Sequence, residues 1–263
     1  MQPEVAQKIA AHQRGPATFL NWVAARERKP LLHTAEYPLY TDAQIIGEAT
    51  YGPYTFLNTI GMPAGNVRAA LVLRYDWHWI FPHPDWSRTD AERYHGGSPA
   101  DEVAGLASLC LGARFKAGDS TRVFRPGDDP KGRPTALLSR PIPLLVLSNF
   151  YGRVLPRVAE GQRSLELLAP LAMLPDLDEL AALTLIRCAR IYQDALWIAE
   201  SQPQLAWLLL VSALETAAVY WRVRNDEAAV RLRWEHAEPM EICLHWNLHC
   251  PLALQTRLRM RLA

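Results

Sequence analysis

The sequence predicts an α+β protein, with a mixed amino-terminal domain over residues 1–150 and a helical carboxyl-terminal domain over residues 151–263. Two observations support this class. Short apolar runs broken by proline, glycine and aromatic residues fill much of the first half, which is typical of strands and turns. Long apolar runs with helical spacing dominate the second half up to about residue 222. Because the strands precede the helices, a small antiparallel sheet is favoured over a parallel βαβ layout.

Composition narrows the class of protein. Hydrophobic residues make up 49% of the 263 residues and charged residues 21%, so a large core is expected and global disorder is not. The net charge of +1, from 28 basic and 27 acidic residues, argues against a histone-like nucleic-acid binder but allows a local basic patch. The amino terminus lacks the apolar run of a secretory signal, so a cytoplasmic protein is expected. No cofactor is predicted.

The first half contains one clear strand. Residues 1–29 indicate one or two short amphipathic helices, with an apolar segment at 17–23. Residues 67–79 alternate apolar and polar side chains, which predicts a strand with one buried and one solvated face. The aromatic and histidine residues of 77–86 fit either ordinary packing or a surface on which single-stranded nucleic acid stacks.

A helix is predicted to open at Ser98. Arg114 lies near its carboxyl end, where the helix dipole favours positive charge. A short strand is expected at 121–125 and a loop at 126–134. No phosphate loop, dinucleotide-binding turn, serine-hydrolase elbow or zinc-peptidase helix motif occurs in the sequence, which argues against those enzyme classes. The apolar face of the helix at Ser98 is expected to consist of Val103, Leu106, Leu109 and Cys110.

Residues 136–175 form a connector that includes a short helix from Ser164 to Met173 and the expected domain boundary. Two long helices follow, at 176–202 and 203–222, separated at Pro203 because proline cannot continue a helix but fits a first turn. Asp176 is the expected amino-terminal cap of the first.

The second long helix is apolar almost all round, so it is expected to be covered on most sides. Glu215 and Thr216 interrupt it, which argues against a membrane span. A carboxylate in a buried helix needs a partner, and Arg187, Arg190 and Arg222 are the candidates. Glu215 is then either part of a structural ion pair or a residue that orients a catalytic group.

These helices carry a resemblance to a known family. The run from Arg190 to Leu196, followed by a proline, by Ala206-Trp207-Leu208 and by Ser212-Ala213-Leu214-Glu215, resembles the HEPN helical domains and is most similar to the ApeA-like branch. Upstream, Asp101 to Leu109 with Gly112 resembles a segment that precedes HEPN domains in that branch. The resemblance implies a helical domain that self-associates.

The resemblance also implies a candidate site. Active HEPN proteins cleave RNA without a metal, using an arginine and a histidine four to six residues later at a site built across a dimer. Arg231 and His236 have this spacing, although Leu232 stands where the family prefers a polar residue. The implied catalytic pair is Arg231 and His236, supported by Glu215 and Arg190. The implied function is RNA-directed, with a ribonuclease role in stress or phage defence.

An alternative function remains open. In this alternative the chain is a non-catalytic dimerising helical module that binds a protein or nucleic-acid ligand. In the tail, Cys243, His245, His249 and Cys250 together with His236 offer zinc-type ligands within a short stretch. Because His249 and Cys250 are adjacent, which is awkward for chelation, no metal is predicted, and no membrane partner is expected.

Overall fold

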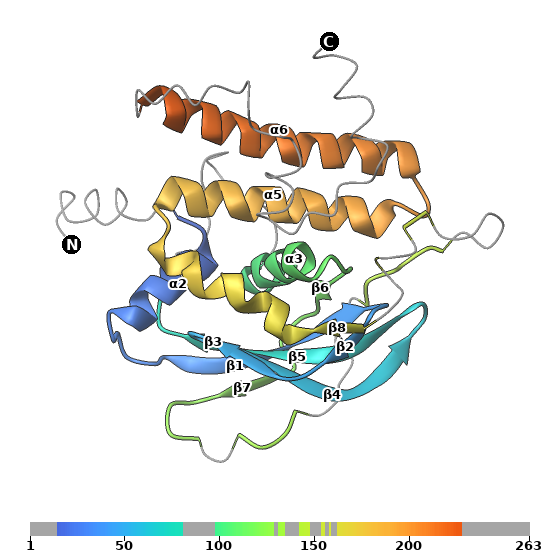
Figure 1. The fold of residues 1–263 in the computed structure, drawn as a ribbon. Coiled ribbons are helices and arrows are strands. Elements are labelled where there is room, and N and C mark those ends of the chain that lie inside the picture. The colour runs from blue at the N-terminus through green and yellow to red at the C-terminus, as the bar shows by residue number, and fades with distance from the viewer. Residues whose placement is uncertain are drawn as a thin grey trace, which may run out of the picture. The chain divides into compact units, whose positions relative to one another are not determined.

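The computed structural model describes residues 15–80, 98–128, 131–134, 142–147, 154–155, 158 and 162–227 (Figure 1). It has an antiparallel sheet in the amino-terminal part and helices in the carboxyl-terminal part, which confirms the predicted α+β class. The chain divides into two compact units, Met1–Ala217 and Ala218–Ala263. The predicted boundary after residue 150 therefore falls inside the first unit.

The strands of the main sheet all lie between residues 33 and 124. Its strand order is β3-β4-β5-β1-β6, with β7 also paired to β1, and every pair is antiparallel. A second, two-stranded sheet pairs β2 with β8 in parallel. The strands are β1 (His33–Thr41), β2 (Gln44–Ile46), β3 (Ala49–Tyr51), β4 (Tyr54–Ala64), β5 (Val67–Trp77), β6 (Lys116–Ala117), β7 (Arg122–Phe124) and β8 (Gln162–Ser164).

Strand β5 confirms the clearest sequence prediction and corrects part of it. It spans Val67–Trp77, and every second residue from Val67 to Tyr75 is buried as expected. Between these positions Arg68 is exposed, but Ala70, where the pairing with β1 shifts register, and Val72 are also buried. The expectation of one fully solvated face is therefore wrong in the middle of the strand, where polar alternation gives way to small and branched apolar residues.

The helices lie over one face of the main sheet (Figure 1). They are α2 (Ala17–Arg26), α3 (Pro99–Leu111), the 3₁₀ helix η1 (Leu165–Asp176), α5 (Glu179–Ile198) and α6 (Pro203–Glu227). A single core cluster joins strands β1, β4 and β5 to α2, α3, η1 and α5, with Leu39, Phe56, Leu73, Leu106, Phe115, Leu168 and Ile186 fully buried or nearly so. The helices η1 and α5 are thus packed into the same core as the sheet.

Local capping explains where two helices begin. Helix α3 opens after Ser98, as the sequence predicts, and Ser98 forms a capping box with Asp101. The cap of α5 is Asp178, whose carboxylate accepts from the Ala181 N–H at 2.7 Å. The prediction of Asp176 is wrong, because the 3₁₀ turns of η1 extend through Pro175 to Asp176 and the α-helix begins only afterwards.

The start of α2 is capped from a distant part of the chain. Its own cap position is Pro16, which has no side-chain hydrogen bond to offer. Instead the buried carboxylate of Glu102, on α3, accepts from the backbone N–H of Ala17 at 3.2 Å and of Thr18 at 2.8 Å. A negatively charged acceptor at a helix amino terminus also interacts favourably with the positive end of the helix dipole. Helices α2 and α3 are therefore joined by buried hydrogen bonds from backbone N–H groups to a carboxylate as well as by apolar packing.

A glycine allows the β3–β4 turn to approach α2. Gly52 has a φ of +54°, in the left-handed region that glycine adopts readily. A Cβ atom at this position would lie 2.3 Å from the indole ring of Trp22. Trp22 in turn packs edge-to-face on Tyr54, with ring centroids 5.2 Å apart. The absence of a side chain at Gly52 is therefore what lets the indole seat on the turn.

Candidate functional site

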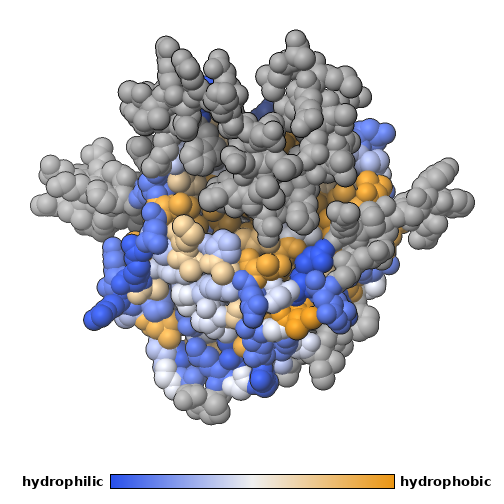
Figure 2. Space-filling view, viewed as in Figure 1, coloured by the Kyte–Doolittle hydropathy of each residue, from blue (hydrophilic) through white to orange (hydrophobic). Residues whose placement is uncertain are grey.

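Helix α6 leaves an apolar surface uncovered within the first unit. It begins at Pro203, as predicted, but only Ala206 and Ala213 are buried between residues 203 and 217. The expectation that it is covered on most sides is wrong. On the face drawn in Figure 2, apolar side chains gather mainly at the level of the helices, and the lower part is mostly hydrophilic. The exposed apolar residues of α6 in this unit are Leu205, Trp207, Leu208 and Leu214.

Length and composition alone qualify this helix as a membrane span. Among the described residues it is the one candidate, over Pro203–Tyr220, with a mean hydropathy of 1.2 and 11% of the window buried. A single helix of this kind is weak evidence for membrane insertion, because the buried core helices of water-soluble proteins pass the same test of length and composition.

The covered side of α6 is formed by small residues. Ala206 and Ala213 are buried, and the Cys188 thiol of α5 donates to the Ala213 carbonyl at 3.3 Å. Burial raises the pKa of the Cys188 thiol to about 11, so this sulfur stays protonated and contributes packing. Within the first unit α5 lies between α3 and α6 (Figure 1). The uncovered side of α6 therefore faces away from α5.

The two predicted supporting residues are not brought together in the structure. Arg190 donates to the backbone carbonyl of Asp101 at 3.1 Å and to the side-chain oxygen of Gln193 at 2.8 Å, so it serves the α3–α5 contact. Glu215 is exposed on α6. The expectation that Glu215 is a buried carboxylate is therefore wrong. An exposed carboxylate is solvated by water, so it does not need an arginine partner.

The predicted catalytic pair lies outside the described residues. Arg231 and His236 both follow residue 227, as do the potential zinc ligands Cys243, His245, His249 and Cys250. Their roles stay predictions. In the part of the chain that the structure describes, no three His, Cys, Asp or Glu side chains are grouped so that they could hold a metal ion.

The structure contains a buried ionic cluster that was not predicted from the sequence. Arg114 is fully buried just after α3, and its guanidinium contacts Asp42 at 2.6 Å and Glu200 at 2.9 Å. Its Nε donates to the Leu196 carbonyl at the end of α5, at 2.7 Å. The carboxylate of Glu200 also accepts from the Val154 N–H at 2.8 Å. This cluster ties the β1–β2 connection to the ends of α3 and α5.

Glu200 makes the stability of the fold depend on pH. Burial alone raises the pKa of this carboxyl, but the N–H groups of Val154 and Leu155 and the Arg114 guanidinium outweigh it, so the pKa lies below 4.5. The ionised form is thus favoured by folding, and its contribution is present above pH 4.5 and lost as pH falls through the depressed pKa.

We expect Glu200→Gln to lower the free energy of unfolding at pH 7, with the difference from wild type narrowing as pH falls below about 4. Urea unfolding at about pH 7, 5, 4 and 3 measures it. Glu166→Gln, at an exposed position in η1, serves as the matched control and should follow wild type at every pH. A constant difference across this pH range would contradict the prediction.

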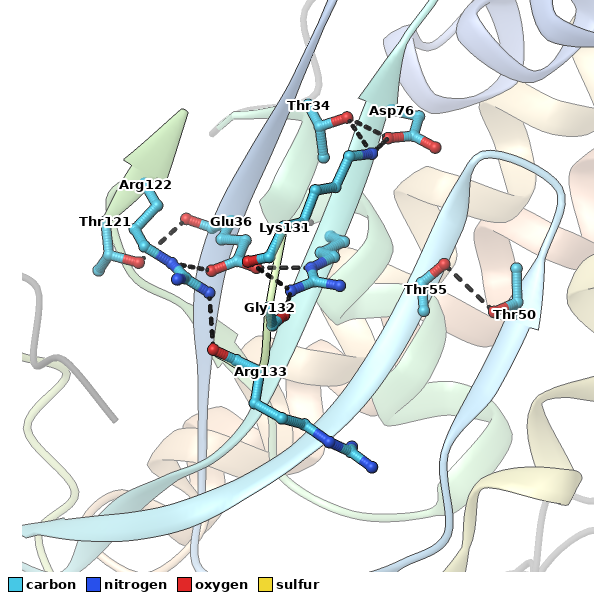
Figure 3. Close-up of polar contacts among 11 residues, drawn as sticks. Thr34, Glu36, Thr50, Thr55, Asp76, Thr121, Arg122, Lys131, Gly132 and Arg133 are labelled. Atoms are coloured by element: carbon cyan, nitrogen blue, oxygen red, sulfur yellow. Dashed lines mark hydrogen bonds and ion pairs between the residues drawn. The ribbon is translucent and has the colours of Figure 1, made fainter. Parts of the chain in front are cut away.

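A row of polar side chains crosses the sheet on the face opposite the helices (Figure 3). Strand register aligns the row across five strands, since each member is the direct partner of the next. Glu36, which is 1% exposed, lies near its centre and accepts from the Nε of Arg74 and the Nε of Arg122, each at 2.6 Å. The row runs Thr50, Thr55, Arg74, Glu36, Arg122.

No family model, curated protein or solved structure matches this chain. The resemblance to HEPN domains therefore remains a prediction from the residues that carry it. The structure itself supplies two surfaces for a functional argument: the uncovered apolar side of α6 and the charged row on the sheet.

Proposed function

We propose that this chain is a cytoplasmic interaction module that self-associates through the uncovered side of α6. The observation that carries the proposal is the exposure of large apolar side chains along one helix: Leu208 is 61% exposed and Leu205, Trp207 and Leu214 each more than 40%. Contiguous exposed apolar residues on a folded domain mark interaction surfaces, because leaving them in water forfeits their transfer free energy.

The order of residues along this side favours a second copy as the partner. Gln204, Leu208, Val211 and Glu215 recur at intervals of four, three and four residues, so they form one stripe along the helix. If two copies of α6 pair antiparallel about a twofold axis beside Leu209 and Leu210, Leu208 lies opposite Val211 of the second copy. The same axis sets Gln204 opposite Glu215 of the second copy.

This pairing satisfies both the apolar and the polar positions of the stripe. The centre is aliphatic, and at each end a Gln204 amide can donate to the Glu215 carboxylate of the second copy. Trp207 and Leu214 flank the stripe on one side, where the same axis brings them together across the contact. An isologous contact requires such self-complementarity, with an apolar centre and a polar rim.

Leu208→Glu tests the proposal. Placing two carboxylates at the centre of the contact should weaken association at least about tenfold, because the apolar contact is lost and the charges repel. Multi-angle light scattering over a concentration series measures the mass of wild type and variant. The expected result is a wild-type dimer and a variant monomer.

Leu180→Glu is the matched control, since Leu180 is 57% exposed but lies on α5. It should leave the mass of the dimer unchanged. A wild-type chain that is monomeric at every concentration, or a Leu208→Glu variant that dimerises like wild type, would reject the proposal. Flotation of the protein with neutral lipid vesicles would instead indicate a membrane as the partner of α6.

A second proposal follows from the resemblance alone: that the module acts on RNA, with His236 as general acid or base at a ribose 2′-hydroxyl and Arg231 stabilising the phosphorane charge. The spacing of these two residues supports it. A self-associating helical domain is compatible with a site that needs two copies. Cleavage of labelled RNA by the wild-type protein, compared with a variant that lacks the His236 imidazole, separates this activity from plain association.

A further inference from the structure

The charged row on the sheet holds a short segment of chain against its outer face. This segment, residues 131–134, is called the strap (Figure 3). Arg74 donates through Nη2 to the carbonyls of Lys131 and Gly132, and Arg122 donates through Nη2 to the carbonyl of Arg133 at 3.2 Å. Three successive backbone carbonyls of the strap are therefore bound by two arginines of the sheet.

The side chains of the strap add two further ionic contacts. The Lys131 ammonium donates to the Thr34 hydroxyl at 2.8 Å and lies 3.4 Å from the Asp76 carboxylate. The Arg133 guanidinium pairs with Glu48. Gly132, between them, has a φ of +65°, which lets the backbone turn its carbonyls toward the arginines. The strap is thus attached largely by charge-assisted hydrogen bonds.

Glu36 controls this attachment through the two arginines. One oxygen of Glu36 accepts a hydrogen bond from the Nε of Arg74 and the other accepts one from the Nε of Arg122. The Nη2 groups of both arginines then point at the strap. A neutral amide at this position keeps one acceptor oxygen but presents an NH₂ donor to the other guanidinium. The carboxylate therefore positions both arginines at once.

We infer that the strap is an ionic latch on the sheet, closed by the Arg74–Glu36–Arg122 trio and opened by loss of the Glu36 charge or by high salt. Opening frees both guanidiniums from the strap carbonyls and exposes the charged row to solvent. Salt acts chiefly on the partly exposed pairs, Lys131 with Asp76 and Arg133 with Glu48, because screening is strongest there.

Trypsin cleavage between Lys131 and Gly132 reports the open state. A protease needs the segment detached and the lysine free, whereas the closed latch holds the Lys131 ammonium on Thr34 and Asp76. When opening is fast, the cleavage rate follows the open population. Initial rates at this bond, measured by mass spectrometry on the intact full-length protein, should rise at least about tenfold in Glu36→Gln, which corresponds to about 1.4 kcal/mol.

Glu27→Gln is the control, because it makes the same change at an exposed ion pair with Lys29. It should cleave at the wild-type rate. Asp76→Asn, which removes the charged partner of Lys131, is the second variant and should also speed cleavage, so the test stands even if Glu36→Gln does not fold. Raising NaCl from about 0.05 to about 1 M should speed cleavage of wild type relative to a reference peptide.

Two results would overturn the latch. One is cleavage of folded Glu36→Gln at the wild-type rate, with circular dichroism and thermal unfolding showing an intact fold. The other, if that variant does not fold, is an Asp76→Asn protein whose cleavage matches wild type at low and at high salt. Neither cleavage measurement depends on the oligomeric state, so the latch proposal and the α6 dimer proposal can each be rejected without the other.

Discussion

Arg114→Met should lower the free energy of unfolding by about 3–5 kcal/mol, because it leaves a buried ionic cluster without its cation. The side chain is fully buried, and removing its charge strands the carboxylates of Asp42 and Glu200 in the interior. The Leu196 carbonyl loses a donor as well. Methionine fills most of the volume, so the loss reports the charge and the hydrogen bonds. Urea unfolding at neutral pH measures it.

Arg125→Met, at an exposed arginine after β7, is the control and should change stability by no more than about 0.5 kcal/mol. A second variant, Arg114→Met combined with Glu200→Gln, should recover part of the loss, because one of the two uncompensated charges is gone. If Arg114→Met costs less than about 1 kcal/mol, or if the double variant is less stable than the single one, the cluster is not a coupled ionic unit.

His236→Ala should reduce RNA cleavage by about 10²–10⁴-fold if the RNA-directed proposal holds, because a general acid or base contributes on that scale. The protein should remain folded, with the mass and thermal unfolding of wild type. Labelled single-stranded RNA is incubated with equal concentrations of both proteins, with and without a chelator. Cleavage by wild type should persist with the chelator, since the proposed chemistry uses no metal.

His249→Ala is the matched control, a histidine of the same tail that lies outside the proposed pair. It should cleave RNA like wild type. Equal cleavage by His236→Ala and wild type would reject the assignment. A wild-type chain that cleaves no RNA but forms the α6 dimer would leave the non-catalytic module as the function.

Local signals predicted the elements of the fold well. Alternation located β5 to within two residues of its end, and the Ser98-Pro99 pair located the start of α3. Pro203 separated α5 from α6 as expected. These succeeded because each rests on chemistry within a few residues, where the competing conformations are few. The prediction that Asp176 caps α5 failed because Asp178, two residues further on, offers an equivalent capping side chain.

Long-range pairing could not be predicted from one sequence. Arg114 is a favourable charge near a helix end by its local context, yet its partners Asp42 and Glu200 are 72 and 86 residues away. Glu36 reads as one polar residue in a strand, and only the register of three strands sets it between two arginines. The apolar composition of α6 predicted burial wrongly, because hydropathy records what a helix contains and not what lies beside it.

The carboxylate of Glu102 sets an order on the assembly of the chain. On a ribosome, residues 17 and 18 emerge long before residue 102, and until then the first two amide groups of α2 have only water to bind. Helix α2 is therefore completed by a segment made more than eighty residues later. A nascent fragment cut short before α3 would carry the strands β1 to β5 but lack the acceptor that fastens the start of α2.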